Sequence, residues 1–287
     1  MAQSKTVGVV GAGTMGSGIA HVSAQSGFRV IVVEAQESQL ERAKRYIGEI
    51  NGRNVEKGRL TQAQADEMLG RMRFETDLAA LSEADIVIEA IYEDLEAKKE
   101  VFRRLDGIAR EGVILATNTS SMSITEIGRA TARPERTVGL HFFNPAQVMK
   151  LVEVVRGYYT SDATMAEAQA FAEALGKTAI AVQKDQPGFV VNRVLMPLLA
   201  EACKVVEEGV ASVEDVDTAV KLGLNHPMGP FTLLDFTGVD VCYAVMDYFY
   251  REFGDPAYKP PLLLHQLVRA GRMGKKSGAG FYDYSER

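Results

Sequence analysis

The sequence is poor in cysteine, and this scarcity limits what the protein can be. Only Cys203 and Cys242 occur in 287 residues, and their spacing is not that of a metal site or a disulfide framework. Both lie in apolar helical patterns, which is typical of buried, reduced core residues. We therefore expect a reducing, cytoplasmic compartment and no bound metal.

Long apolar runs and an excess of basic residues are also missing. No apolar run approaches the ~20 residues that a membrane span requires. Because residues 1–5 run directly into the first expected strand, we expect no signal or transit peptide. The net charge of −6 argues against a nucleic-acid or anionic-membrane surface as the main partner. With 46% hydrophobic and 24% charged residues, the composition is that of a soluble globular protein.

A glycine pattern near the start organises the first half of the chain. A short β-branched run, residues 7–10, ends in Gly11-x-Gly13-x-x-Gly16, and a helical pattern follows at once. Gly11 permits a tight turn, Gly13 lets a pyrophosphate approach the backbone, and Gly16 allows close packing of helix on strand. The free N–H groups and the positive end of the helix dipole then face the phosphates. The pattern predicts a dinucleotide-binding β-α-β unit.

An acidic residue follows at the spacing that this unit requires. Gly27 has the position of a helix C-cap, a second strand is predicted over residues 28–33, and Glu34 comes at its end. A carboxylate about 20 residues after the glycines binds a ribose 2′-hydroxyl. The alternative for Glu34 is a solvated loop acid. Because a carboxylate there would repel a 2′-phosphate, we predict NAD rather than NADP.

Two helices are expected after the second strand, and they form an insertion into the minimal dinucleotide fold. Capping boxes, Ser38-x-x-Glu41 and Thr61-x-x-Gln64, predict helices over residues 38–50 and from 61 to about 71. One explanation of the basic residues here is an ordinary solvated face. The other is a rim for an anionic ligand tail. These residues are Lys44, Arg45, Arg53, Lys57 and Arg59.

Strands and helices continue to alternate through the first two thirds of the chain. Strands are predicted over residues 84–90, 112–117, 137–140, 150–155 and 178–182, with helices over 94–105 and 163–175 and a short one capped by Ser123-x-x-Glu126. This alternation predicts a doubly wound, Rossmann-type sheet, which binds ligands at the carboxyl ends of its strands. Polar residues follow several of these ends: Glu93, Asn118–Ser121 and His141.

The pattern changes at residues 185–188, beyond which no convincing strand occurs. Helices are predicted over residues 189–208, 213–222, 230–237, 239–253 and 261–270. We therefore predict an α/β protein with two domains. Residues 1–186 would form a Rossmann-type domain with a helical insertion, and residues 187–287 would form an all-α domain.

His141 is the candidate catalytic group of the first domain. It ends a buried strand beside two phenylalanines, where a satisfied core histidine is the common alternative. Glu153 lies on the next strand and can reach an imidazole nitrogen, which would fix the tautomer and raise the basicity of the ring. Oxidation of a carbinol by hydride transfer needs a base of this kind, because the hydroxyl proton must leave as the hydride does.

Two further polar residues are candidates for binding substrate oxygens. Ser120 follows the strand that ends near residue 117, and its alternative role is a helix cap. Asn192 lies in the first turn of the helix after Pro187, at the expected domain junction, where clefts form. Its alternative role is a tie between the domains.

Together these motifs resemble the short-chain L-3-hydroxyacyl-CoA dehydrogenases, most closely the bacterial 3-hydroxybutyryl-CoA dehydrogenases. The resemblance covers essentially the full length and is carried by five segments. They are Gly11-Ala-Gly-Thr-Met-Gly16, Asn118-Thr-Ser-Ser121, His141-Phe-Phe-Asn-Pro145, Asp185-Gln-Pro-Gly-Phe-Val-Val-Asn-Arg193 and His226-Pro-Met-Gly-Pro230. Glu34 stands where many members of the family carry aspartate.

The resemblance implies a role for each candidate residue. His141 would be the general base, paired with Glu153, and Ser120 and Asn192 would bind the 3-hydroxyl and neighbouring substrate oxygens. The implied cofactor residues are Gly11, Gly13, Thr14, Met15 and Gly16 at the phosphates, Glu34 at the ribose, and Glu93, Lys98, Asn118 and Asn144 around the nicotinamide half. The helical insertion would bind coenzyme A, and its basic residues Lys44, Arg53 and Lys57 would contact that anionic group. The helical domain would bind substrate and form a homodimer.

The implied reaction is a reversible hydride transfer between NAD and the 3-position of a short L-3-hydroxyacyl-CoA. Two alternatives remain open. One is a related NAD-dependent dehydrogenase of a free hydroxy acid. Basic residues that bind coenzyme A would distinguish an acyl-CoA dehydrogenase from that alternative. The other is a non-catalytic protein on a dehydrogenase fold, against which the joint presence of Ser120, His141, Glu153 and Asn192 speaks.

Overall fold

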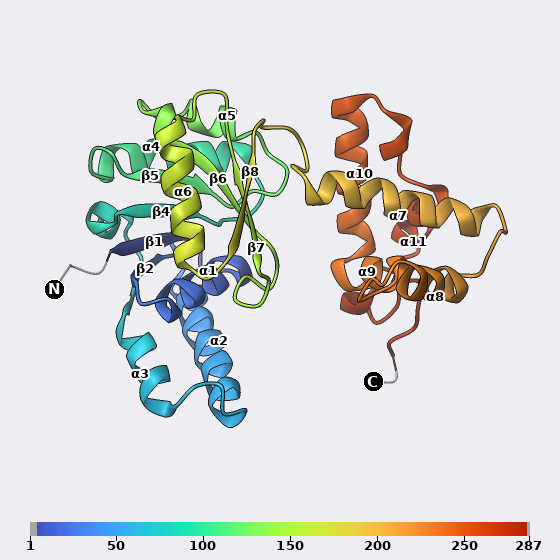
Figure 1. Ribbon diagram of the computed structural model, residues 1–287, viewed down its shortest axis with the longest axis horizontal. Helices are drawn as coiled ribbons and strands as arrows, with labels where there is room; N and C mark the ends of the chain where they lie inside the picture. Colours follow the sequence, from blue (N-terminus) through green and yellow to red (C-terminus); the bar gives the residue numbers. More distant parts are fainter. Residues whose placement is uncertain (1–4, 286–287) are drawn as a thin grey trace. The chain divides into compact units, whose positions relative to one another are not determined.

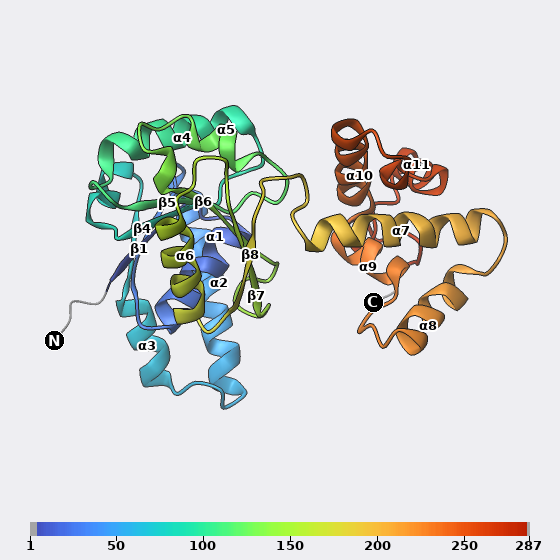
Figure 2. The same ribbon diagram turned by 45° about the horizontal axis from the view of Figure 1, so that its top comes forward.

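The chain divides into two compact units, Met1–Phe189 and Val190–Arg287. The computed structural model describes residues 5–285, so the expected leaderless start at Met1–Ser4 lies outside the described residues. The first unit alternates strands with helices and the second is helical (Figures 1 and 2). Within residues 5–285, no helix has both the length and the apolar character needed to cross a membrane.

A single sheet forms the first unit, and its strands follow the order β3-β2-β1-β4-β5-β6-β7-β8. From β3 to β6 all neighbours are parallel, whereas β7 runs antiparallel to β6 and parallel to β8. The carboxyl ends of β1, β4, β5 and β6 therefore lie side by side at one edge. The strands are β1 (Thr6–Val10), β2 (Arg29–Val33), β3 (Met72–Glu75), β4 (Ile86–Glu89), β5 (Ile114–Thr117), β6 (Thr137–Phe142), β7 (Leu151–Val155) and β8 (Thr178–Val182).

Helices cover both faces of this sheet, because side chains alternate along each strand and both sets are apolar. In β1, Val7 and Val9 join the core under α1 (Thr14–Gln25) and α6 (Asp162–Ala174). Val10 joins the core on the other face, under α4 (Leu95–Ile108), α5 (Ile124–Gly128) and the 3₁₀ helix η1 (Leu78–Glu83). The predicted fold class, a doubly wound sheet followed by a helical region, is confirmed.

The helical insertion extends from the sheet as α2 (Glu37–Glu56) and α3 (Gln62–Gly70) (Figures 1 and 2). The capping box at Thr61 is present as predicted, with Gln64 as its partner. The box predicted at Ser38 is wrong, because α2 already begins at Glu37 and its N-cap is Gln36. The carboxylate of Glu34 accepts the N–H of Gln36 at 3.2 Å and so supports the chain before Ser38 is reached.

The second unit packs its helices around an apolar core. Its helices are α7 (Val191–Glu207), α8 (Val213–Gly223), α9 (Pro230–Thr237), α10 (Val239–Phe253) and α11 (Leu262–Arg269). Cys203 and Cys242 lie in this core as free, buried thiols, as predicted, and burial raises the pKa of each to about 12. After α11, the buried carboxylate of Asp235 fixes the main chain at Phe281 and Tyr282, whose N–H groups it accepts at 2.8 and 2.9 Å.

Candidate active site

The glycine turn between β1 and α1 has the geometry that each glycine predicts. Gly11 has φ +99°, and a Cβ there would lie 2.6 Å from the carbonyl oxygen of Ala90. A Cβ on Gly16 would collide with the carbonyl oxygen of Gly11. Gly13 differs, because its φ is −68° and no atom lies within 4 Å of an added Cβ. No neighbouring atom within residues 5–285 therefore requires glycine at position 13, which fits close approach of a ligand to that backbone.

The start of α1 fits a pyrophosphate for a second reason. No side chain caps this helix, and Gly13 and Thr14 are exposed. An uncapped helix start presents N–H groups and the positive end of the dipole to an anion. The residues present therefore fit the dinucleotide that the sequence predicts.

Glu34 lies directly beside the glycine turn. Its Oε2 accepts the N–H of Ala12 and its Oε1 accepts the N–H of Gln36, both at 3.2 Å. The two bonds fix the carboxylate at the carboxyl edge of β2 while each oxygen keeps further acceptor capacity. This position suits the predicted ribose contact, which stays a prediction.

A buried ion pair joins the end of β4 to α4, and the sequence reading missed it. Glu89 is 0% exposed, Lys98 is 1% exposed, and the ammonium lies 2.7 Å from Glu89 Oε1. The same oxygen accepts the N–H of Ile91 at 2.7 Å, and Oε2 accepts the hydroxyl of Thr117 at 2.7 Å. The available signal was a lone carboxylate in an apolar strand, since a buried charge needs a partner. Lys98 was predicted as a cofactor residue, but its ammonium is engaged with protein oxygens.

Glu93 extends this ion pair towards the loop after β5. Its Oε2 lies 3.1 Å from the ammonium of Lys98, and its Oε1 accepts from the Thr119 hydroxyl at 2.6 Å and the Ser120 N–H at 2.9 Å. Burial alone would raise the pKa of Glu93, but the charge of Lys98 and these hydrogen bonds outweigh it and hold the pKa below its ordinary value. The carboxylate therefore stays ionised while it anchors the loop that carries Ser120.

His141 and Glu153 form a direct hydrogen bond, as the sequence analysis expected. They are opposed partners in the antiparallel β6–β7 ladder, and Nδ1 lies 2.7 Å from Glu153 Oε2. Glu153 is 0% exposed and His141 only 5%. The carboxylate fixes the tautomer with hydrogen on Nδ1, so that Nε2 is the nitrogen able to accept a proton. Among the described residues, Nε2 has no hydrogen-bond partner.

Aromatic rings and a neighbouring loop hold the imidazole at the carboxyl edge. Phe143 and Phe189 pack against the His141 ring with centroid distances of 4.5 and 5.6 Å. Phe189, which the sequence reading did not single out, has φ +49°, a conformation that side chains other than glycine rarely adopt. Asn118 accepts the N–H of Phe142 at 2.9 Å and thereby ties the loop after β5 to the end of β6.

The remaining candidates belong to separate elements of the chain. Asn144 is exposed after β6, and Asn192 lies in the first turn of α7 in the second unit. Lys44 and Arg53 are nine residues apart on α2, which at about 100° per residue places them on opposite sides of the helix. Each is near a glutamate, Lys44 at 2.6 Å from Glu41 and Arg53 at 3.5 Å from Glu49. Lys57 follows α2 directly and is exposed.

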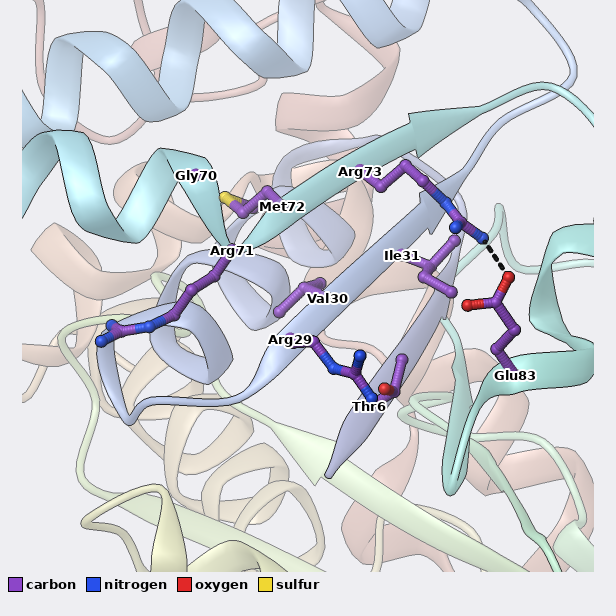
Figure 3. Close-up of a pocket in the computed structure, with 9 residues that line it drawn as sticks. All are labelled: Thr6, Arg29, Val30, Ile31, Gly70, Arg71, Met72, Arg73 and Glu83. Carbon is purple, nitrogen blue, oxygen red and sulfur yellow. Dashed lines mark hydrogen bonds and ion pairs between the residues drawn. The ribbon is translucent and has the colours of Figure 1, made fainter. Parts of the chain in front are cut away.

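A cavity of about 200 Å³ lies at the opposite, amino edge of the sheet (Figure 3). It is lined by the starts of β1, β2 and β3, including Thr6, Arg29 and Met72. Arg73 reaches Glu83 at 3.1 Å, whereas Arg71 points away from this pair (Figure 3). Since doubly wound sheets bind dinucleotides at their carboxyl edge, this cavity is separate from the candidate active site.

The glycine turn, the Glu34 carboxylate and the buried imidazole thus lie along one edge of one sheet. This arrangement, a dinucleotide site with a proton acceptor beside it and a carboxylate at the ribose position, is that of the nicotinamide-dependent oxidoreductases.

Within that class, the chain belongs to the 3-hydroxyacyl-CoA dehydrogenase family. Residues 6–186 match the family profile "3-hydroxyacyl-CoA dehydrogenase, NAD binding domain", and residues 188–284 match the C-terminal domain of the same family. The predictions of family, enzyme class and NAD as cofactor are confirmed.

Individual relatives align over nearly the whole chain. A probable 3-hydroxybutyryl-CoA dehydrogenase of Deinococcus radiodurans is 49% identical, with 96% of this chain and 99% of that protein covered. A probable 3-hydroxybutyryl-CoA dehydrogenase of Bacillus subtilis is 48% identical, with 99% and 98% covered. The crystal structure of (S)-3-hydroxybutyryl-CoA dehydrogenase from Ralstonia eutropha superimposes with a TM-score of 0.95 at 45% identity and covers 99% of this chain and 100% of that one.

Proposed function

We propose that the protein is a 3-hydroxybutyryl-CoA dehydrogenase. It would interconvert a short L-3-hydroxyacyl-CoA and the 3-oxoacyl-CoA, with acetoacetyl-CoA as the test substrate. The support is the near-complete coverage and 48–49% identity of relatives that carry this name. NAD, when bound, takes up or returns the hydride of C3.

The bond between His141 and Glu153 is the observation that supports the proposed chemistry. In the oxidation direction, the C3–H bond breaks with its electron pair leaving as hydride, and the hydroxyl proton passes to His141 Nε2. The ring then carries a positive charge on Nδ1–H and Nε2–H. Glu153, at 2.7 Å from Nδ1 and buried, stabilises that charge more than water would. In the reduction direction the same nitrogen returns the proton.

The other candidate residues receive binding roles in this proposal. Ser120 and Asn192 would hydrogen-bond the 3-oxygen and the thioester region of the substrate. The glycine turn with Thr14 and Met15 would hold the pyrophosphate, and Glu34 the ribose. The residues proposed around the nicotinamide half are Glu93, Lys98, Asn118 and Asn144, with Lys98 acting mainly through its bonds to Glu89 and Glu93.

Coenzyme A would bind along the helical insertion. Arg53 and Lys57 are four residues apart, so they lie on nearly the same side of α2 and its end, whereas Lys44 lies on another side. A single phosphate group would therefore contact Arg53 and Lys57 together more readily than Arg53 and Lys44. The second unit would bind substrate and form the interface of a homodimer.

The decisive test is reduction of acetoacetyl-CoA followed by the loss of NADH absorbance. We expect turnover in the wild type and a fall in kcat of at least ~100-fold for His141→Gln, the usual contribution of a general acid–base group. His265→Gln, which changes a histidine stacked on Tyr243 in the second unit, is the matched control and should keep wild-type turnover. Near-normal kcat in His141→Gln would remove the imidazole from its role.

The same assay separates the alternatives. A dehydrogenase of free hydroxy acids would show no competition between free coenzyme A and substrate, and a non-catalytic protein would show no turnover at all. Glu153→Gln replaces a charged acceptor by a neutral one, so we expect a loss of about 1–1.5 kcal/mol, or about tenfold in kcat. In the His141→Gln background the same change should add little, because the two residues act as a unit.

A further inference from the structure

Three charged side chains at the ends of β4 and α4 form a group that we call the carboxyl-edge triad: Glu89, Lys98 and Glu93. The ammonium lies 2.7 Å from Glu89 Oε1 and 3.1 Å from Glu93 Oε2. A third oxygen, the carbonyl of Ile91, lies 3.4 Å from it. The three protons of the ammonium thus meet three oxygens, and two carboxylates share one cation. The triad therefore carries a net charge of −1.

This charge is shielded from water on one side and open on the other. Glu89 and Lys98 are 0% and 1% exposed, whereas the side chain of Glu93 is 39% exposed. Charges that are buried in protein act over longer distances than charges in water, because the effective dielectric constant is lower. The exposed part of Glu93 lies after β4, which is the direct neighbour of β1 and its glycine turn. The surplus negative charge is thus directed to the edge where a dinucleotide binds.

We propose that the surplus charge of the carboxyl-edge triad makes this site favour the oxidised cofactor, with buried Glu89 as a determinant of that preference. The inference rests on the proposed function, in which the nicotinamide half lies near Glu93. The oxidised nicotinamide ring carries a positive charge and the reduced ring is neutral. A net negative charge beside the ring therefore stabilises the oxidised form relative to the reduced form, and lowers the ratio Kd(NAD)/Kd(NADH).

A purely structural role for Glu89 makes a different prediction, and substitutions can separate the two. In Glu89→Gln, the amide oxygen can accept from Lys98 and from the Ile91 N–H, and the amide NH₂ can donate to the Thr117 hydroxyl. This variant keeps the three neighbours in contact and makes the triad neutral, but it reverses the bond with Thr117, whose hydroxyl donates to Glu89 in the wild type; Thr117→Val controls for that change. Thr117→Val removes a contact of Glu89 and keeps the charge at −1.

Two more variants complete the series. Glu93→Gln also makes the triad neutral, but at the more exposed carboxylate, where folding is less at risk. The double variant Glu89→Gln/Lys98→Met removes one charge of each sign and restores the net charge of −1. Glu89→Gln and Glu93→Gln therefore make the triad neutral, whereas Thr117→Val and the double variant keep its charge at −1.

The experiment is titration of each purified variant with NADH by fluorescence and with NAD by competition. We expect Kd(NAD)/Kd(NADH) to rise by about tenfold or more in Glu89→Gln and Glu93→Gln, the size expected when one unit charge within about 12 Å of the ring is lost at an effective dielectric constant near 20. The ratio should stay near the wild-type value in Thr117→Val. In the double variant both separate Kd values should rise, because Lys98 positions Glu93, but their ratio should stay close to that of the wild type. A wild-type ratio in both neutral variants, or a rise in the double variant equal to that in Glu89→Gln, would overturn the proposal.

The design keeps this test separate from the test of the proposed function. If Glu89→Gln does not fold, Glu93→Gln and the double variant still compare a neutral triad with a charged one. If the wild type binds both cofactors but does not reduce acetoacetyl-CoA, the proposed function fails while the ratios still report on the triad. If the wild type is active and the ratios do not follow the charge, only the present inference fails.

Discussion

Gly11 and Gly13 offer a paired test of the cofactor site, because the structure assigns them different reasons for being glycine. Gly13 has ordinary backbone angles, φ −68° and ψ −173°, and a methyl group there meets no atom within 4 Å. In Gly13→Ala, the weaker helix N-cap and the reduced freedom of the unfolded chain oppose each other, so the free energy of unfolding should change by less than about 1 kcal/mol. Gly11→Ala forces φ +99° on alanine and places Cβ 2.6 Å from the Ala90 oxygen. We therefore expect the free energy of unfolding to fall by about 1–3 kcal/mol.

Gly13→Ala should weaken NAD binding strongly, although it hardly changes the free energy of unfolding. If a pyrophosphate approaches this backbone, the added methyl displaces it from N–H donors that each contribute about 1.5–3 kcal/mol to a charged acceptor. The Kd for NAD should then rise by at least about tenfold in Gly13→Ala. Urea unfolding measures the first quantity and calorimetric titration with NAD the second.

Gly48→Ala is the matched control for both measurements. Gly48 lies in α2, and an added Cβ there also meets no atom within 4 Å. This change should leave NAD affinity unaltered and raise the free energy of unfolding by about 0.5–1 kcal/mol. Wild-type NAD affinity in Gly13→Ala, or destabilisation as large as that of Gly11→Ala, would refute the assignment of the phosphate site to this turn.

Substitutions at three further positions test single features. Glu34→Ala should weaken NAD by about tenfold and NADP less, since the carboxylate binds a hydroxyl and repels a phosphate; equal losses in titrations with both cofactors would contradict the ribose contact. Burial, with a smaller contribution from the charge of Lys177, lowers the pKa of His21 below 6.5 despite its hydrogen bond to Asn51. Folding therefore favours the neutral ring, and its contribution is complete above pH 6.5 and lost as the pH falls through the lowered pKa. Urea unfolding across this range should show a smaller loss in His21→Gln than in the wild type, and an identical pH dependence would argue against the assignment. Phe189→Ala should lower the free energy of unfolding by about 3 kcal/mol, because its ring is buried against Ile124, Val155 and Val182, and Phe189→Leu should cost less; equal stability of both variants in the same assay would contradict this packing.

The parts of the fold that depend on local patterns could be predicted from the sequence. The strand before the glycine turn, the capping box at Thr61 and the helices α9 and α10 follow from residues within a few positions of each other. The bond between His141 and Glu153 could also be expected, because β6 and β7 are consecutive strands joined by a short connection, residues 143–150. These predictions need no knowledge of distant contacts.

Other features depend on contacts that the sequence does not reveal. The edge strand β3 has only four residues, one of them an exposed arginine, and its residues pair with residues of β2 that lie 42 positions earlier in the chain. Ser38 has the spacing of a cap, but Glu34 and Gln36 start the helix earlier. In the sequence, Glu89 is an ordinary residue of a strand. Its role depends on two distant partners: Thr117, which is opposite it in β5, and Lys98, which reaches it from α4.

The reversal of direction between β6 and β7 has a consequence for how this enzyme can vary. His141 and Glu153 are opposite each other in a hydrogen-bonded ladder, so the pairing of the two main chains sets the distance between their side chains. A shift of one residue in β7 would turn the carboxylate to the far face of the sheet, whereas lengthening the connection between the strands would leave the pairing intact. The connection between β6 and β7 can therefore change in length while the proposed proton-transfer pair keeps its geometry.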